Sequence, residues 1–180
     1  PQMMLRSEDK REFLEALGPA DDFLLVDGYN IIFAWDELHR LAAQDVAAAR
    51  GALIDILANY QGFRKCRVIV VFDAYKVKGN PGSVQTVHGV KVVYTKEAET
   101  ADTYIERATY ELRRERRVRV ATSDGPEQVI ILGHGALRVS ARAFHAEVEA
   151  AEGQISAVLQ RLTNRPRSER TIRNNVKLKQ

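Results

Sequence analysis

The sequence is poor in the residues that build disulfide- or zinc-stabilised domains. It contains one cysteine, Cys66, which excludes an internal disulfide and fits a reducing compartment. The four histidines are scattered and lack the ligand spacing of a zinc site. No apolar run approaches the roughly 20 residues that a membrane-spanning helix needs, and the first residues contain no apolar stretch of signal-peptide length. We therefore expect a cytoplasmic protein that does not enter a membrane.

The length suits one domain, because single cores commonly span roughly 100–200 residues. We expect this domain to cover residues 23–163. Residues 1–22 are expected to form a helix or a linker, in which Ser7 can cap a short amphipathic helix. Because the chain begins with Pro1 and not with methionine, this segment could also come from a longer protein. Residues 164–180 are expected to form a basic tail.

Positive charge is concentrated in two stretches, although the net charge is only +3. ELRRERRVR covers residues 111–119, and the last 20 residues contain seven basic residues against the single acid Glu169. Concentrated positive charge is the usual footprint of a polyanionic partner. The alternative is a solvated surface helix and a solvated tail.

Short apolar runs alternate with helical patterns from residue 23 onward, which predicts an α/β fold. Strands that alternate with helices imply a mainly parallel sheet covered on both faces. The strand-like runs are residues 23–27, 67–73, 87–95, 118–124 and 137–140. Helical patterns cover residues 36–63 (as one helix or two), 99–115, 125–135 and 141–162.

Three of the strand-like runs end in the same way, as LLVDGYN, VVFDAY and VATSDG. Because the carboxyl ends of parallel strands lie on one edge, where ligands bind, we expect Asp27, Asp73 and Asp124 to converge there. One such aspartate is usually a turn former or a helix cap, but three in one small domain indicate a site. Clustered carboxylates repel each other unless a cation neutralises them, and hard oxygen ligands suit Mg²⁺ or Mn²⁺.

A further group of acids precedes and enters the helix expected after residue 99. Glu99, Asp102 and Glu106 are spaced at i, i+3 and i+7, so that they share one helix face. Acids in a first turn also complement the helix dipole, which is the alternative explanation. If they face the active edge of the sheet, they complete a metal cage.

These motifs in this order, VDGYN, VFDA, ETAD followed by IE, and TSDG, resemble the NYN branch of the PIN-like nucleases, and in particular the YacP-type proteins of bacteria. The resemblance covers roughly residues 23–162. It implies a Rossmann-like α/β/α sandwich with a mainly parallel sheet, and an endoribonuclease dependent on Mg²⁺ or Mn²⁺. For YacP-type members it also implies that mRNA is cleaved in association with the ribosome. The segment before residue 23 has no counterpart in this pattern.

The resemblance also implies which residues form the site. Asp27, Asp73, Asp102 and Asp124 are then the catalytic and metal-binding acids, with Glu99 as a further candidate ligand. Asn30 is expected to orient an acid or to contact phosphate. Metal ions held by aspartates can activate water, neutralise the phosphate and stabilise the leaving oxygen, so no serine or cysteine nucleophile is needed. The products would carry 5′-phosphate and 3′-hydroxyl ends.

RNA and the ribosome are the expected partners, and basic and aromatic residues are the candidates for RNA contacts. Tyr29 could stack on a base or pack into the core, and Lys76 and Lys78 follow Asp73 closely. The full set of expected RNA contacts is Tyr29, Lys76, Lys78, Ser123, Arg113, Arg114, Arg116, Arg117, Arg165, Arg167, Arg170 and Arg173.

Four other functions compete with this interpretation. A HAD-type phosphohydrolase needs a second aspartate two residues after the first, where this chain has Tyr29. A 5′-nuclease related to DNA polymerases shares the LLVDG start, but has a larger acidic set and a helical arch for which this chain has little room. A nucleotide-binding Rossmann enzyme needs a glycine-rich turn in place of DGYN. A PIN-like RNA- or ribosome-binding module with little or no catalysis is the serious alternative, although all four main acids are present.

Overall fold

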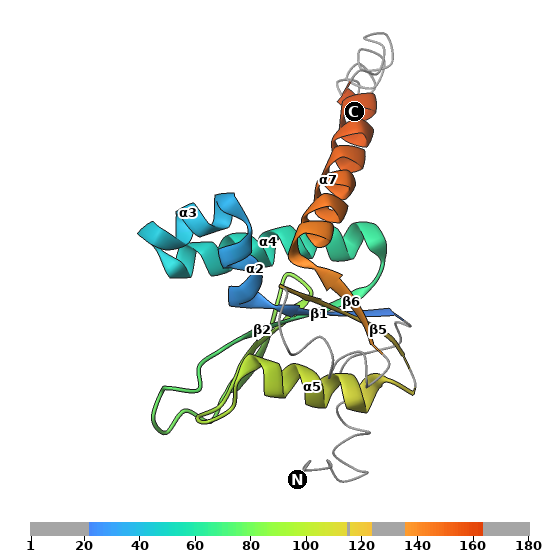
Figure 1. Ribbon diagram of the computed structural model, residues 1–180. Helices are drawn as coiled ribbons and strands as arrows, with labels where there is room; N and C mark the ends of the chain where they lie inside the picture. The colour runs from blue at the N-terminus through green and yellow to red at the C-terminus, as the bar shows by residue number, and fades with distance from the viewer. Residues whose placement is uncertain (1–21, 115, 124–135, 164–180) are drawn as a thin grey trace, which may run out of the picture.

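A mixed, mainly parallel sheet forms the centre of the computed structural model, which describes residues 22–114, 116–123 and 136–163 (Figure 1). Within these residues the sheet has six strands in the order β3-β4-β2-β1-β5-β6. Their bounds are β1 (Asp22–Asp27), β2 (Arg67–Phe72), β3 (Ser83–Val87), β4 (Val90–Tyr94), β5 (Arg117–Thr122) and β6 (Leu137–Ser140). The prediction of a mainly parallel sheet is confirmed.

Strand β1 lies in the middle and pairs in parallel with β2 on one side and β5 on the other. Strands β4 and β6 extend the parallel pairing outward, and only β3 is antiparallel, on β4. The turn between β3 and β4 consists of His88 and Gly89, both with positive φ (49° and 85°). Two successive positive φ values are typical of the tightest hairpin connection. The strand-like run expected over residues 87–95 therefore begins with this turn, and the sequence pattern does not predict β3 before it, because SVQTV is mostly exposed.

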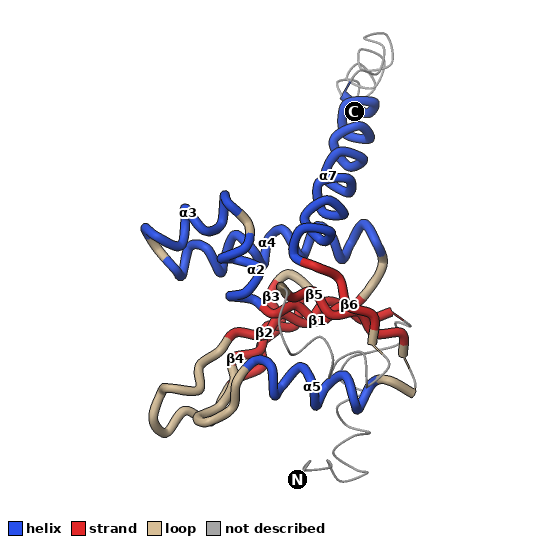
Figure 2. The backbone as a smooth tube through the Cα atoms, viewed as in Figure 1, coloured by secondary structure: helices blue, strands red, loops and turns tan. Residues whose placement is uncertain are grey.

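Helices cover both faces of the sheet, as Figure 2 shows. The helices α2, α4 and α7 lie on one face and α5 on the other. Their bounds are α2 (Gly28–Ala34), α3 (Asp36–Gln44), α4 (Val46–Arg64), α5 (Ala101–Leu112) and α7 (Ala141–Thr163). The fold is therefore the α/β sandwich that the sequence predicts. No helix in the described part of the chain is both long enough and apolar enough to cross a lipid bilayer.

The central strands β1 and β2 are apolar along most of their length because both of their faces are buried. In β1, Leu24 and Val26 pack into the core under α2, α4 and α7, whereas Phe23 and Leu25 pack into the core under α5. Successive side chains of a strand point to opposite faces. A strand in the middle of a two-sided sheet therefore gives a continuous apolar run and not an alternating one.

Two details of the helices differ from the sequence-based expectation or complete it. The sequence pattern predicts no helix between residues 27 and 36, but α2 begins at Gly28 and buries Ile31 and Ile32 in the core. The long pattern over residues 36–63 forms two helices, α3 and α4. They separate at Asp45, whose carboxylate accepts a hydrogen bond from the Ala48 backbone N–H at 3.1 Å and so caps α4.

Trp35 ties the end of α2 to the start of α7. Its indole Nε1–H donates to the carbonyl oxygen of Ala141 at 2.9 Å, and its ring stacks on Phe144 with centroids 5.5 Å apart. Phe144 in turn contacts Tyr60 of α4 edge to face. This aromatic cluster joins the helices of one layer next to the carboxyl ends of β1 and β6.

Several expected segments lie outside the described residues. They are the helix or linker over residues 1–22 except its last residue, the helix over residues 125–135 and the basic tail over residues 164–180. Strand β1 begins at Asp22, one residue before the expected start of the domain. The expected domain boundaries therefore stay predictions.

A pair of glycine substitutions tests how closely α2 packs on the sheet. A Cβ at Gly28 would lie 2.4 Å from the Phe72 ring and 3.0 Å from the Val71 carbonyl oxygen. We expect Gly28→Ala to lower the free energy of unfolding by about 1–3 kcal/mol, because the core must move to admit the methyl group. In Gly51→Ala, on α4, the new methyl meets nothing within 4 Å, and we expect a gain of about 0.5–1 kcal/mol. Urea denaturation measures both, and equal effects of the two substitutions would contradict the packing described.

Candidate functional site

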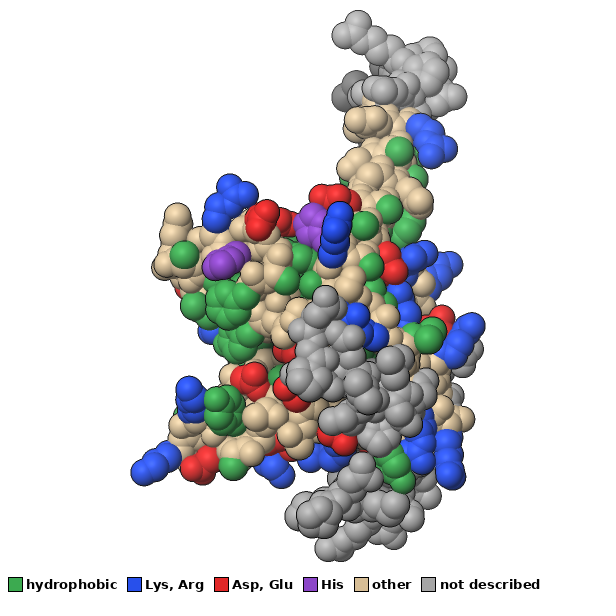
Figure 3. Space-filling model, in the orientation of Figure 1, with side chains coloured by type: hydrophobic (Ala, Val, Ile, Leu, Met, Phe, Trp, Pro, Cys, Tyr) green, Lys and Arg blue, Asp and Glu red, His purple; other side chains and the backbone are tan. Residues whose placement is uncertain are grey.

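The parallel register brings the strand ends together at one edge of the sheet. Asp27 pairs with Val71 of β2, and its neighbour Val26 pairs with Ala121 of β5. Asp73 and Ser123 follow β2 and β5 directly, so they lie at the same edge as Asp27. Asp124 is the next residue after Ser123, but it lies outside the described residues. Figure 3 shows acidic side chains near the middle of the visible face, between the layer of α2 and α3 and the layer of α5.

Asp27 is buried at the junction between β1 and α2. Its side chain makes no capping hydrogen bond to the helix that follows, although only 5% of the residue is exposed. Helix capping, which is the ordinary role of an aspartate in this position, therefore does not explain Asp27. A buried carboxylate at the ligand-binding edge of a parallel sheet is a candidate functional residue.

Asp73 and Asp102 lie together at the start of α5. Oδ1 of Asp73 accepts a hydrogen bond from the Ala101 backbone N–H, in the first turn of the helix. Burial raises the pKa of the Asp73 carboxyl, the Ala101 hydrogen bond opposes that rise, and the negative charge of Asp102 adds to it. The hydrogen bond to Ala101 thus holds Asp73 beside the first turn of α5, where Asp102 lies, and the role of Asp102 in the site stays a prediction.

The residues just before Asp102 already have partners within the protein. Glu99 is buried and forms an ion pair with Arg107, with Oε2 and Nη1 2.8 Å apart. A metal ion bound by Glu99 would have to compete with this pair. The role of Glu99 as a ligand stays a prediction. Thr100 caps α5 by accepting a hydrogen bond from the Thr103 backbone N–H.

Asn30 connects α2 to the end of β5. Its Oδ1 accepts a hydrogen bond from the Ser123 backbone N–H at 2.7 Å. This contact holds the backbone of Ser123 at the end of β5. The two roles expected for Asn30, orienting an acid or contacting phosphate, stay predictions. Ser123 itself lies at the same edge and is half-buried.

Tyr29 packs at the border of the core. Its ring lies 5.1 Å from the ring of Phe72 between centroids, and its hydroxyl accepts a hydrogen bond from Nη1 of Arg50 at 3.1 Å. The side chain is only partly buried. These contacts correspond to packing against the core, which is one of the two roles expected for Tyr29. Base stacking by Tyr29 stays a prediction.

Lys76 and Lys78 lie on an anchored loop beside Asp73. Both are exposed. The loop is held by Asn80, whose Nδ2 donates to the carbonyl oxygen of Thr95 at 2.9 Å. The loop is therefore tied to the segment that leads into α5, and it presents two lysines next to the acidic edge.

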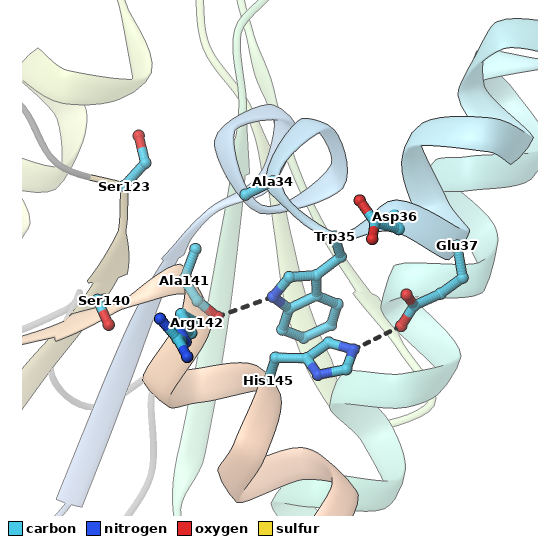
Figure 4. A pocket seen from close by; sticks show the side chains of 9 residues that line it. All are labelled: Ala34, Trp35, Asp36, Glu37, Ser123, Ser140, Ala141, Arg142 and His145. Atoms are coloured by element: carbon cyan, nitrogen blue, oxygen red, sulfur yellow. Dashed lines mark hydrogen bonds and ion pairs between the residues drawn. The ribbon is translucent and has the colours of Figure 1, made fainter.

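A hollow of about 450 Å³ lies on the other side of this edge, beside Ser123 (Figure 4). Trp35, Arg142 and His145 line it, and His145 Nε2 lies 2.7 Å from Oε1 of Glu37. Burial acts to raise the pKa of Glu37, but hydrogen bonds from its own backbone and from His145 outweigh it and leave the pKa lowered. We missed these residues in the sequence, although β6 was predicted as a parallel strand and the start of α7 must therefore reach the same edge.

The donor chemistry at this edge fits a hard divalent cation. Asp27, Asp73 and Asp102 offer carboxylate oxygens, which Mg²⁺ and Mn²⁺ prefer, and the raised pKa of Asp73 shows that negative charge is costly there. Within the described part of the chain, however, no three side chains of His, Cys, Asp or Glu are grouped closely enough to hold a metal ion. The expected fourth acid, Asp124, is not among those residues.

The arginines of the first basic stretch lie at the other edge of the sheet. Arg113 and Arg114 follow α5, and Arg116 and Arg117 lead into β5. The amino end of a parallel strand is the end away from the acidic edge, so these residues do not line the site of Asp27 and Asp73. The expected RNA contacts in the tail lie outside the described residues: Arg165, Arg167, Arg170 and Arg173.

Comparison with known proteins identifies relatives over most of the chain. A protein from Bacillus subtilis (strain 168) named "Uncharacterized protein YacP" is 48% identical over 144 residues, which are 79% of this chain and 84% of the relative. Two crystal structures of Rae1 (YacP) from Bacillus subtilis match with TM-scores of 0.70. The first is 44% identical and covers 88% of this chain and 91% of its own. The second, a point mutant, is 43% identical and covers 81% of this chain and 85% of its own.

The family model matched by the sequence is described as a YacP-like NYN domain, and it covers residues 24–180. The resemblance drawn from the DGYN, FDA, ETAD and SDG motifs is thereby confirmed. The arrangement of the sheet, with acids at the carboxyl ends of its central strands, agrees with it. This chain belongs to the YacP-like NYN family.

Proposed function

We propose that this protein is a divalent-metal-dependent endoribonuclease that hydrolyses RNA phosphodiester bonds, and that it acts on mRNA in association with the ribosome. The NYN domain is a nuclease-type domain. The observation that carries the proposal is that Asp73 accepts a hydrogen bond from the Ala101 backbone N–H, next to Asp102, at the edge where β1 ends in the buried Asp27. Carboxylates that are brought together and partly removed from water are typical of sites that hold a cation.

Each candidate residue then has a role at this edge. Asp27, Asp73, Asp102 and Asp124 would hold Mg²⁺ or Mn²⁺, with Glu99 as a further candidate. The bound ion would activate a water molecule and stabilise the charge on the phosphate and the leaving oxygen. Asn30 holds the backbone before Asp124 through its hydrogen bond to Ser123.

The surroundings of the acids offer a path for an RNA strand. On one side, Lys76 and Lys78 are exposed on an anchored loop and can neutralise phosphates. On the other side, the hollow beside Ser123 has the volume of pockets that admit a nucleotide-sized ligand. A strand that crosses the acids would contact both. Association with the ribosome rests on the family resemblance alone.

The first prediction concerns the carboxylates. Asp27→Asn and Asp102→Asn should each lower the rate of cleavage of a single-stranded RNA in Mn²⁺ by at least about 100-fold. Even residues that only orient metal ligands cost roughly 10–100-fold when changed. Asp55→Asn, which changes an exposed acid on α4, is the matched control and should cleave at the parental rate. The assay maps the product ends and is run with and without ribosomes.

Three outcomes are informative in this assay. Loss of cleavage with retained RNA affinity supports metal-dependent hydrolysis at this edge. RNA binding with no cleavage by the parent, in Mg²⁺ or Mn²⁺ and with or without ribosomes, would favour the alternative, a binding module with little or no catalysis. If both aspartate variants cleave RNA at the parental rate, the active site lies elsewhere.

The second prediction uses the pH dependence of stability. Because the pKa of Asp73 is raised on folding, its ionised form destabilises the folded protein, and the penalty grows as the pH rises through the folded pKa. Asp73→Asn keeps an acceptor for the Ala101 N–H and removes the charge. In EDTA it should melt slightly above the parent at pH 7, and this advantage should vanish below the pKa of about 4 of an unfolded aspartate.

Metal ions should reverse the order of the melting temperatures of the parent and Asp73→Asn. Millimolar Mn²⁺ should raise the melting temperature of the parent by mass action, and the rise should be much smaller in Asp73→Asn. Differential scanning fluorimetry from pH 4 to pH 8, with EDTA or with Mn²⁺, measures both effects. If Asp73→Asn melts below the parent at every pH, the charge of Asp73 does not destabilise the folded protein.

A further inference from the structure

A second hollow lies at the opposite edge of the sheet, where the central strands begin. It has a volume of about 510 Å³ and is lined by the amino ends of β1 and β5 and by the residues that follow α4 and α5. Figure 3 shows Lys and Arg side chains gathered at the right of the molecule, beside the carboxyl end of α5. The arginines that line the hollow, here called the arginine pocket, are Arg64, Arg113, Arg116, Arg117 and Arg119.

The arginine pocket carries an excess of positive charge. Arg119 is paired with Glu147 of α7 at 3.1 Å, and among the described residues that line the pocket the one acid is Asp22. It pairs with Arg117 at 2.7 Å, but both side chains are largely exposed, at 52% and 82%. Exposed pairs of this kind are weak and exchange readily with other anions. The charge of Arg117 is therefore available to a ligand at little cost.

Two of the arginines are held in place before any ligand arrives. The guanidinium of Arg113 lies over the Tyr110 ring, 3.6 Å from its centroid, and donates to the Tyr110 carbonyl oxygen at 3.0 Å. Arg119 donates to the Tyr60 hydroxyl at 2.7 Å and to Glu147 at 3.1 Å. Positioned guanidinium groups lose little conformational entropy on binding, and their planar forks match the oxygens of a phosphate.

The arginine pocket is too far from the acidic edge to touch the same phosphate. Asp22, which pairs with Arg117 across β1 and β5, begins the strand that Asp27 ends. Five steps along a strand correspond to roughly 17 Å. At about 3.4 Å per nucleotide of a stacked strand, an RNA must be on the order of five nucleotides long to span this distance.

We propose that the arginine pocket is an anchor for the phosphate backbone of single-stranded RNA, separate from the edge where cleavage takes place. The proposal rests on the proposed function for its choice of ligand. The planar guanidinium of Arg113, which lies over the Tyr110 ring, is a surface of the kind on which RNA bases stack. An RNA long enough to reach from the acidic edge gains affinity from the arginine pocket, and a shorter RNA does not.

The test is equilibrium binding of the full chain to RNA in EDTA, so that it does not depend on cleavage. The variant is Arg113→Gln with Arg117→Gln. Its charge-matched control is Arg40→Glu, which removes the same two units of positive charge at one exposed arginine on α3. The probes are fluorescent oligouridylates of roughly 20 and roughly 3 nucleotides, above and below the spanning length.

The longer oligouridylate should bind the pocket variant at least about tenfold more weakly at 0.1 M salt. The slope of log affinity against log salt should become shallower by about 1.4, since each neutralised phosphate of a single strand contributes roughly 0.7. The shorter oligouridylate should bind the parent and the variant equally. The control should bind both probes as the parent does. Arg113→Lys with Arg117→Lys, which keeps the charge, should restore most of the salt slope.

Three other outcomes would contradict the proposal. Unchanged affinity and salt slope in a pocket variant with the parental melting temperature would overturn it. Equal weakening for both RNA lengths would place these arginines on the cleavage path instead. Polyglutamate that competes for the pocket as well as oligouridylate would make an acidic protein surface the better ligand.

The proposed function can fail separately. If the parent shows the length-dependent difference but cleaves no RNA, the anchor stands and only the proposed function is overturned.

Discussion

The position of β1 between β2 and β5 is the constraint on which the rest of the molecule depends. Parallel pairing on both sides fixes the register, and the register carries Asp27, Asp73 and the residue before Asp124 to one edge. Burial of both faces of β1 makes this arrangement costly to alter, because a slip of one residue would exchange the side chains of the two cores. The acids can therefore be held near one another against their mutual repulsion.

Much of this could be predicted from the sequence, because central parallel strands give an unambiguous pattern. FLLVD and RVIVVFD are continuously apolar and VRVATSD is partly so, which predicts three strands, and the geometry of parallel sheets alone predicts that the residues at their ends meet at one edge. Strand β3 was missed because its side chains are exposed and it pairs on one side only. Helix α2 was missed because Asp-Gly ordinarily marks a turn, whereas here Gly28 admits the ring of Phe72 at a helix start.

The candidate site was predictable where it is built from strand ends and not where it depends on contacts between distant segments. The ion pair between Glu99 and Arg107, and the hydrogen bond from Ser123 to Asn30, are tertiary facts that no local pattern contains. The same is true of the hollow formed by Trp35 and His145, which come from opposite ends of the domain. The first basic stretch was recognised by composition, but only the direction of β5 reveals that it faces away from the acids.

The strand order also has a consequence for the way the chain folds as it is synthesised. Strands β1 and β2, with α2 to α4 between them, can associate early, but β5 emerges much later in the chain. Until then, the side of β1 that will pair with β5 is an open edge of apolar residues, which is prone to join other chains. Closing it requires a long-range contact, which favours slow folding. The newly made protein is therefore most vulnerable to aggregation just before β5 completes the sheet beside β1.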